Sequence, residues 1–352
     1  MASSKKKWLV TGGTGFFGTH MAWHLIKKGI RPVLLDKAPI DDPGLVGKVD
    51  YIQADVRDRV AVDNAVRGCV AVVHAAAALP LEKPRDIWEV TVHGAENVYS
   101  SALRHGVKKS VHIGTTAVYG IPRVHPLYED SLLVPLGAYG EAKCEAEQVG
   151  RRLRRQGLDL TIIRPKTFIG TGRLGVFQIL FDWVESGVRI PVLGKGTNKY
   201  QLLEVTDLVQ AVWLANNAKI KGDDYNVGAS IFSTVNEDVG ALCAHAGTGA
   251  RVWPVPSEPA KIALRIMERF NMSPLYKWVY ETCDHDSFVD TTKIQKALGW
   301  KPLSSNAQTL INTYDWYLRE GKPMALRSGT THRVAWKQGL LGVVKAGLKL
   351  VK

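Results

Sequence analysis

The alternation of short apolar runs with longer amphipathic stretches constrains the fold of this chain more than any other feature. In the first half of the 352 residues, segments with helical spacing follow the apolar runs in turn. The runs are Trp8–Val10, Pro32–Leu35, Asp50–Gln53, Ala71–His74, Ser110–Gly114 and Leu160–Arg164, and the helical segments are Gly18–Lys28, Val60–Val66, Arg85–His105 and Ala138–Gln156. Repeated β-α units of this kind wind a parallel sheet with helices on both faces.

The regular alternation ends near Pro165, and turn-rich segments follow it. This change is typical of a lobe that is built from insertions. We therefore predict an α/β protein with a Rossmann-like, doubly wound parallel sheet and a smaller C-terminal substrate-binding lobe. The expected regions are residues 1–168 for the sheet domain, residues 169–322 for the lobe, interleaved with late sheet elements, and residues 323–352 for a basic tail.

The formal net charge of +13 is concentrated at the two ends of the chain. Residues 1–7 carry three lysines and no acid, and residues 319–352 carry eight lysines or arginines against one glutamate. The segment between them therefore has a net charge of only +3. A nearly balanced body argues against a nucleic-acid partner and leaves a small molecule as the expected one.

The cysteines and the apolar runs exclude other classes of protein. The four cysteines are scattered without a metal-ligand spacing, so we predict neither a disulfide framework nor a metal site. No apolar run reaches the ~20 residues of a membrane span. Residues 1–7 lead directly into the first strand instead of a signal-peptide core, and we therefore expect a cytoplasmic protein.

A glycine-rich segment separates the first strand from the first helix. It reads Trp8-Leu-Val-Thr-Gly-Gly-Thr-Gly-Phe-Phe-Gly18. Glycines at this spacing permit a tight turn and a close approach of the backbone to a pyrophosphate, which the free N–H groups of a helix start bind. The expected contacts from this segment are Gly12, Gly15, Phe16, Phe17 and Gly18.

An acidic residue at the end of the second strand selects the cofactor. Asp36 follows the glycines by about 20 residues, where a carboxylate binds the ribose hydroxyls of NAD and repels the 2′-phosphate of NADP. We predict NAD, although the neighbouring Lys37 is a base that tolerates a phosphate. Residues after the third and fourth strands are expected to contact the same cofactor, with the first of them reaching the adenine amine: Asp55, Val56, Ala75 and Ala76.

A tyrosine and a lysine four residues apart open the fourth helical segment. In Tyr139-Gly-Glu-Ala-Lys143 the two side chains share one helical face. A free phenol has a pKa of ~10, so it needs a nearby cation to exchange protons near neutrality. Lys143 would supply this cation and hold the nicotinamide ribose. Thr115 and Thr116 offer hydroxyls just past the fifth strand, at the end of the sheet where ligands bind.

Taken together, these motifs resemble the NAD-dependent epimerase/dehydratase family, the extended branch of the short-chain dehydrogenases. The resemblance runs from Lys7 to about Pro302, and its distal landmarks are Arg164-Pro165, Val205-Thr-Asp207, Tyr225-Asn-Val-Gly228 and Leu298-Gly-Trp-Lys-Pro302. It implies that Thr115, with Thr116 as the alternative, positions the substrate oxygen while Tyr139 transfers its proton. It also implies a cofactor contact by Arg164 and a homodimer.

Two departures from the family bear on the substrate. Members that act on nucleotide sugars tend to have an asparagine where this chain has Thr167, and an arginine where Lys199-Tyr200-Gln201 stands. Lys199 or Arg173 would supply only a point charge in place of a bidentate arginine. These departures argue against a nucleotide-sugar substrate. The predicted substrate is a lipophilic secondary alcohol or ketone, as in the 3β-hydroxysteroid and sterol dehydrogenases, which a membrane-surface location of the tail would suit. The alternatives are a nucleotide-sugar epimerase or dehydratase that regenerates NAD, and a non-catalytic NAD-binding regulator.

The end of the chain bears on the same question. Residues 336–352 place lysines on one helical face and leucines and valines on the other, which predicts a basic amphipathic helix able to lie peripherally on an anionic membrane. Packing of this tail on the body or on a second subunit is the competing interpretation.

The residues after the fifth strand bear on the type of reaction. Residues 117 and 118 are alanine and valine, so they supply neither the extra acid nor the extra base of a dehydratase.

Overall fold

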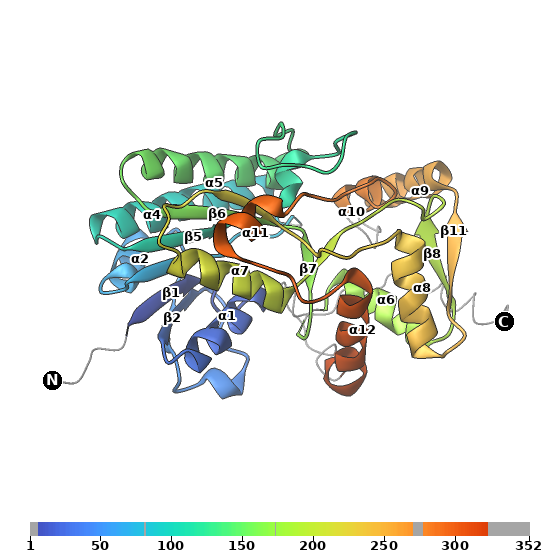
Figure 1. The fold of residues 1–352 in the computed structure, drawn as a ribbon, viewed down its shortest axis with the longest axis horizontal. Helices are drawn as coiled ribbons and strands as arrows, with labels where there is room; N and C mark the ends of the chain where they lie inside the picture. The colour runs from blue at the N-terminus through green and yellow to red at the C-terminus, as the bar shows by residue number, and fades with distance from the viewer. Residues whose placement is uncertain (1–5, 81, 173, 270–276, 323–352) are drawn as a thin grey trace.

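The structure, a computed structural model, describes residues 6–80, 82–172, 174–269 and 277–322 (Figure 1). A parallel sheet with helices on both faces occupies one end of the molecule, and a smaller lobe occupies the other. The predicted tail helix at residues 336–352 lies outside the described residues. None of the helices that the structure describes is long and apolar enough to cross a membrane.

The large sheet has seven parallel strands in the order β10-β6-β5-β4-β1-β2-β3. Its strands are β1 (Lys7–Thr11), β2 (Arg31–Asp36), β3 (Asp50–Gln53), β4 (Ala71–His74), β5 (Lys109–Ile113), β6 (Leu160–Pro165) and β10 (Asp224–Val227). The strand order reverses between β1 and β4, which is where such sheets bind ligands at their carboxyl ends. The predicted doubly wound sheet is confirmed.

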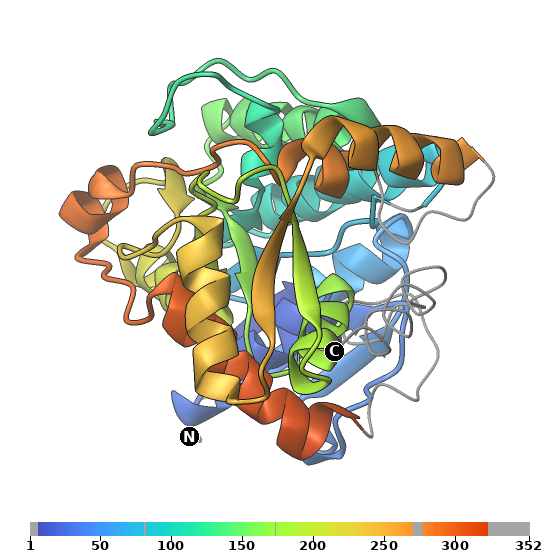
Figure 2. The ribbon, with the colours of Figure 1, turned by 90° about the vertical axis from the view of Figure 1, so that its right-hand side faces the viewer.

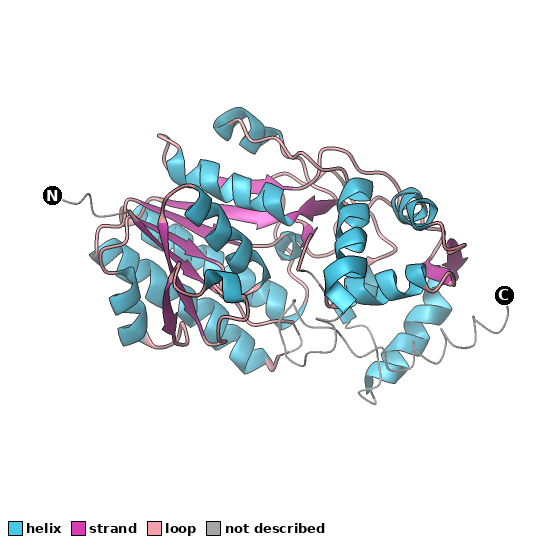
Figure 3. Cartoon of the chain, turned by 90° about the horizontal axis from the view of Figure 1, so that it is seen from below, coloured by secondary structure: helices cyan, strands magenta, loops and turns pink. Residues whose placement is uncertain are grey.

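Two layers of helices bury the two faces of this sheet. Helices α1 (Phe16–Lys27) and α7 (Val205–Asn217) cover one face, and α2 (Arg59–Val66), α4 (Gly94–Arg104) and α5 (Gly137–Arg155) cover the other (Figure 3). Successive strand residues point to opposite faces, so Val10 packs in the first layer and Leu9 in the second. Both residues have no exposed surface, and the sheet is therefore a double-sided core.

The helical segment expected at residues 85–105 is interrupted. It forms α3 (Pro84–Trp88), a turn of π-helix η2 (Glu89–His93) and α4. A π-turn inserts an extra residue into a helix and changes its direction of packing. At the junction, a Cβ on Gly94 would lie 2.6 Å from Cγ2 of Val56, so the helix passes against the loop after β3 at a position where only glycine fits.

The distal half of the chain builds the lobe but also completes the sheet domain. Strand β10 and helix α7 belong to the sheet, and α11 (Thr292–Leu298) packs on β10. The lobe contains two parallel strand pairs, β7 (Thr167–Ile169) with β9 (Leu202–Glu204) and β8 (Arg189–Leu193) with β11 (Arg251–Val255). The two strands of the second pair, β8 and β11, lie side by side in Figure 2. The division of the chain near residue 168 stays a prediction.

The lobe has its own apolar core, in which Phe181, Trp183 and Tyr314 are buried. Its helices are α6 (Val176–Glu185), α8 (Val235–Ala246), α9 (Ser257–Arg269), α10 (Lys277–Thr282) and α12 (Asn306–Trp316). Short helical turns complete the described chain, at η1 (Pro43–Leu45), η3 (Thr116–Tyr119) and η4 (Tyr317–Gly321).

Candidate active site

A cavity of about 650 Å³ opens at the carboxyl ends of the sheet strands and is lined by both the sheet domain and the lobe. From the sheet domain it takes residues at or just past the carboxyl ends of the strands β2 to β6. These residues are Asp36 after Leu35, Asp55 after Ala54, Ala75 and Ala76, Thr115 and Thr116, and Lys166 after Pro165. The cavity therefore lies where a doubly wound sheet places its ligand.

The glycine segment forms one end of this cavity. Gly12 adopts a φ of 66°, and a Cβ there would lie 2.9 Å from the backbone nitrogen of Ala76. A Cβ on Gly18 would lie 2.2 Å from the carbonyl oxygen of Gly12, so the turn and the first turn of α1 are packed backbone against backbone. Gly12, Gly15, Phe16, Phe17 and Gly18 all line the cavity.

The start of α1 fits an anionic group of a dinucleotide. Gly15 is the N-cap residue, and no side chain of the described residues caps the helix. The first N–H groups of a helix have no partner within it, and together with the helix dipole they favour a phosphate. The residues present therefore fit the pyrophosphate of NAD.

Two carboxylates line the same end. Asp36 accepts hydrogen bonds from the backbone nitrogens of Thr14 at 3.1 Å and Ala38 at 3.0 Å, which fixes its orientation at the end of β2. Asp55 accepts from Nε and Nη2 of Arg57 at 3.0 and 2.8 Å, and this hydrogen-bonded partner lowers the pKa of Asp55. Val56, Ala75 and Ala76 also line the cavity.

Tyr139, Lys143 and Thr115 line the cavity together, although they come from α5 and from the turn after β5. Lys143 is only 4% exposed, and its Nζ donates to the carbonyl oxygen of Ile113 at 2.9 Å. Burial lowers the pKa of Lys143 to about 8, against the opposing field of Glu147. An ammonium held in this way faces the same space as the phenol of Tyr139.

The two threonines after β5 have different partners. The Oγ1 atom of Thr115 accepts from the backbone nitrogen of Ala117 at 3.1 Å, which leaves its own O–H available as a donor. The hydroxyl of Thr116 donates to the carbonyl oxygen of Pro165 at 3.4 Å. Both residues line the cavity, and their hydrogen bonds favour Thr115 as the donor to a ligand.

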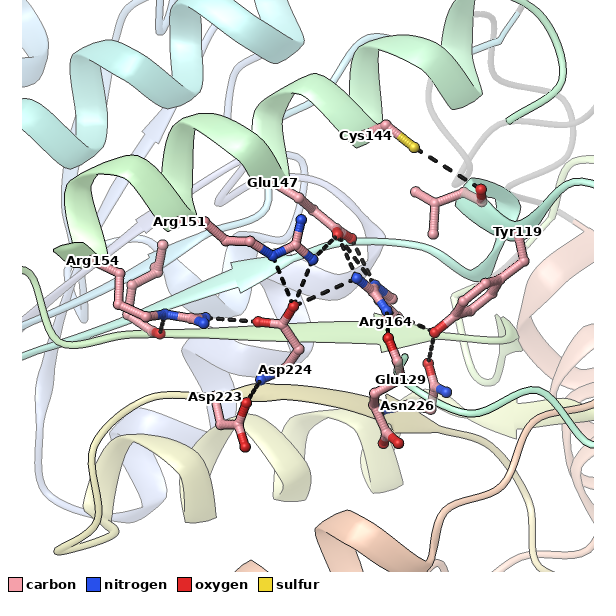
Figure 4. A network of polar contacts seen from close by, with 12 residues as sticks. Tyr119, Glu129, Cys144, Glu147, Arg151, Arg154, Arg164, Asp223, Asp224 and Asn226 are labelled. Carbon is pink, nitrogen blue, oxygen red and sulfur yellow. Dashed lines mark hydrogen bonds and ion pairs between the residues drawn. The ribbon is translucent and has the colours of Figure 1, made fainter. Parts of the chain in front are cut away.

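Arg164 does not line the cavity, although the sequence predicted a cofactor contact for it. It is 1% exposed and lies in a polar network behind the sheet edge (Figure 4). Its guanidinium donates to Glu147 at 2.8 to 3.2 Å and to the hydroxyl of Tyr119 at 2.7 Å. A third contact goes to Asp224 at 3.5 Å. Because these partners occupy its donors, Arg164 holds β6, β10 and α5 together.

The lobe end of the cavity has a mostly apolar lining. Its apolar residues are Val176, Phe177, Leu180, Ile190, Pro191, Val192, Leu193, Leu202, Val235, Val239 and Leu310. Thr167 and Tyr200 also line it, and their hydroxyls lie 3.1 Å apart. Of the two basic residues considered for a phosphate, Lys199 does not line the cavity, and Arg173 lies outside the described residues.

Lys166 lines the cavity and was not singled out from the sequence. It directly follows β6, next to Pro165, so its position at a strand's carboxyl end was visible. The sequence did not reveal that Lys166 lacks an ion pair with any carboxylate in the described part of the chain, because this depends on packing against residues far away in the sequence. Lys166 is 3% exposed, and burial lowers its pKa to about 7.

Comparisons with known proteins agree with this geometry. A model of the NAD-dependent epimerase/dehydratase family matches residues 8–228. The chain is 36% identical over 347 residues to the protein y4nG of Sinorhizobium fredii, a match that covers 97% of this chain and 86% of that protein. It is 27% identical to the dTDP-glucose 4,6-dehydratase of Streptomyces niveus, with 88% and 92% of the two chains covered.

One solved structure shares the fold over nearly its whole length. It is the UDP-glucose 4-epimerase of Thermotoga maritima with UDP-glucose, at a TM-score of 0.75 and 23% identity. The match covers 89% of this chain and 99% of that one.

Proposed function

Because the chain belongs to the NAD-dependent epimerase/dehydratase family, we propose that it interconverts a secondary alcohol and a ketone on a nucleotide-linked sugar and regenerates NAD in each turnover. Membership of this family confirms two of the predictions made from the sequence. The chain is an enzyme of the extended short-chain dehydrogenase type, and its cofactor is NAD.

The observation that carries this proposal is the shared lining of one cavity. Thr115, Tyr139 and Lys143 face the space that the glycine turn and Asp36 also border. NAD, when bound, supplies a hydride acceptor and donor. The protein must then supply a proton acceptor, an orienting donor and a dry site.

Each of these tasks falls to a residue with suitable surroundings. Tyr139 takes the proton of the substrate hydroxyl during oxidation and returns it during reduction. Lys143, anchored on Ile113, favours the phenolate by its charge and holds the nicotinamide ribose. Thr115, whose oxygen accepts from Ala117, donates its own hydrogen to the substrate oxygen. Asp36 binds the adenine ribose.

Relatives favour a nucleotide sugar over the lipophilic substrate that the sequence first suggested. The dehydratase of Streptomyces niveus and the epimerase of Thermotoga maritima are named for such sugars. Thr167 and Tyr200 lie at the cavity wall, where the hydroxyl that accepts in their mutual hydrogen bond can donate its own hydrogen to a sugar. Residues 117 and 118 bring no acid or base, which favours epimerisation over dehydration.

The test is an incubation of the NAD-loaded protein with UDP-glucose, UDP-glucuronate and dTDP-glucose, followed by NMR of the sugar ring. A C4 epimer supports the proposal, and a 4-keto-6-deoxy sugar corrects it to a dehydratase. Tyr139→Phe must abolish either product while retaining NAD. If none of the sugar nucleotides is converted after prolonged incubation although NAD is bound, the proposed substrate class is refuted.

A lipophilic alcohol or ketone is the second candidate, because the lobe end of the cavity is lined mainly by aliphatic and aromatic side chains such as Val176, Phe177 and Leu180. Such walls bind apolar ligands by burying their surface. NAD reduction by a 3β-hydroxysterol, in the absence of any reaction with sugar nucleotides, would establish this candidate. The homodimer and the peripheral membrane contact of residues 336–352 stay predictions.

A further inference from the structure

Three lysines are buried in the described part of the chain, and they differ in their partners. Lys261 pairs with Asp284 at 2.8 Å, and Lys143 donates to a backbone carbonyl within the field of Glu147. Lys166 has no ion pair with any described carboxylate. Its Nζ donates to Oγ of Ser287 at 2.5 Å and lies 5.1 Å from the ring centroid of Tyr200.

The backbone fixes Lys166 at this place. Its amide donates to the carbonyl oxygen of Val227 at 2.9 Å, which ties it to the end of β10. Ser287 is fixed as well, since its amide donates to Lys199 and its carbonyl accepts from Gln201. The ammonium therefore sits in a rigid wall between the sheet domain and the lobe.

Lys166 lies beside the residues that we propose to contact the reacting hydroxyl. Strands β5 and β6 are neighbours in register, with Ile113 opposite Ile163. The threonines after β5 are therefore next to the residues after β6, and Thr116 reaches the carbonyl of Pro165. A substrate whose hydroxyl meets Thr115 and Tyr139 has its next substituents within reach of this wall.

An ammonium removed from water without a counter-ion is unfavourable, and a ligand anion relieves this cost. A hydroxyl and an aromatic ring stabilise a cation only in part. We propose that Lys166, held by Ser287 beside the ring of Tyr200, binds an oxyanionic group of the substrate next to the reacting carbon. This group is a carboxylate on the sugar or a phosphate attached to it. The inference rests on the proposed sugar substrate, and it makes that sugar acidic at this position.

The test observes Lys166 directly in the NAD-loaded full-length protein. Lysine labelled with ¹³C at Cε gives one signal per lysine, and the signal that disappears in Lys166→Arg identifies Lys166. Inorganic phosphate and D-glucuronate are titrated separately, with neutral glucose as the uncharged control. The signal of Lys261, which is buried and already paired, reports any general effect of salt.

A saturable shift of the Lys166 signal by an anion, without a shift at Lys261, supports the inference. Phosphate alone identifies the attached phosphate as the source, and glucuronate alone identifies the sugar carboxylate. No shift with either anion at tens of millimolar, or equal shifts at both lysines, overturns it.

A second measurement separates this inference from the proposed function. Calorimetry compares UDP-glucuronate and UDP-glucose binding in the wild type, Lys166→Met and Lys166→Arg, all loaded with NAD. We expect Lys166→Met to weaken the binding of UDP-glucuronate at least tenfold and Lys166→Arg to retain most of this affinity. Failure of both nucleotides to bind the wild type, with the Lys166 signal still responding to phosphate, refutes the sugar substrate but not the anion site. Equal affinities in Lys166→Met and the wild type overturn the anion site.

Discussion

Lys166→Met should raise the free energy of unfolding at neutral and acidic pH. Methionine has nearly the same length as lysine but carries no charge, so it removes the buried ammonium and leaves the wall filled. The folded-state pKa of Lys166 is about 7, against an ordinary value of 10.5. Between these two pH values the unfolded chain binds more protons than the folded one, so the wild type loses stability as the pH falls from about 10.5 to about 7.

The magnitude follows from the size of this shift. A displacement of 3.5 pKa units corresponds to about 5 kcal/mol below pH 7. The lost hydrogen bond to Ser287 offsets about 1 kcal/mol at every pH. Lys166→Met is therefore expected to be about 4 kcal/mol more stable than the wild type near pH 6. The advantage should vanish at about pH 10 and become a deficit of about 1 kcal/mol above pH 10.5.

Urea unfolding followed by tryptophan fluorescence at a series of pH values measures this difference. Titrating groups that do not interact with Lys166 are common to both proteins and cancel in it, whereas His125, whose pKa is lowered by burial and also by the charge of Lys166, contributes a smaller difference of its own. Lys261→Met is the matched control, because it removes a buried lysine that has a carboxylate partner. It should destabilise the protein by leaving Asp284 without that partner. A stability difference for Lys166→Met that does not change with pH would refute the reasoning.

Three further predictions concern the cofactor and the reaction. Gly18→Ala places a Cβ 2.2 Å from the oxygen of Gly12, so NAD affinity by calorimetry should fall at least tenfold, while Gly240→Ala, with no atom within 4 Å of its Cβ, should leave it unchanged. Asp36→Ala removes the acceptor for the ribose hydroxyls, so the affinity for NAD should fall about tenfold or more, and the protein's preference for NAD over NADP should shrink, as competition binding would show. Tyr139→Phe should reduce turnover by roughly 10² to 10⁴ with an NAD dissociation constant close to that of the wild type, as steady-state kinetics and calorimetry would show. Unchanged turnover would exclude Tyr139 as the proton carrier.

Local chemistry made much of this molecule predictable from its sequence. Glycines at 12, 15 and 18 have one structural use between a strand and a helix, and the structure packs them accordingly. Six of the seven strands of the sheet could be placed because each is a short and mostly apolar run that a turn follows. Strand β10 was not among them. Tyr139 and Lys143 lie four residues apart on α5, so their shared face needed no tertiary information.

Tertiary contacts decided what the sequence did not reveal. Arg164 lies near the carboxyl end of β6, at the edge of the sheet where ligands bind. Its side chain is instead bound by Glu147 on α5 and Asp224 on β10, in the polar network behind that edge. Gly94, directly after the π-turn of η2, passes close to Val56, and the local sequence does not reveal this contact. The importance of Lys166 depends on Ser287, which is 121 residues away.

The most direct test of hydride transfer with Tyr139 as the proton carrier is the absorbance at 340 nm of the NAD-loaded protein mixed rapidly with UDP-glucose, UDP-glucuronate, dTDP-glucose or a 3β-hydroxysterol. We expect transient formation of NADH with a substrate of the correct class in the wild type and in Tyr119→Phe, whose phenol is bonded to Arg164 and does not line the cavity. Tyr139→Phe should show almost none. Equal NADH formation in Tyr139→Phe and the wild type, or none in any protein despite bound NAD, would contradict the account.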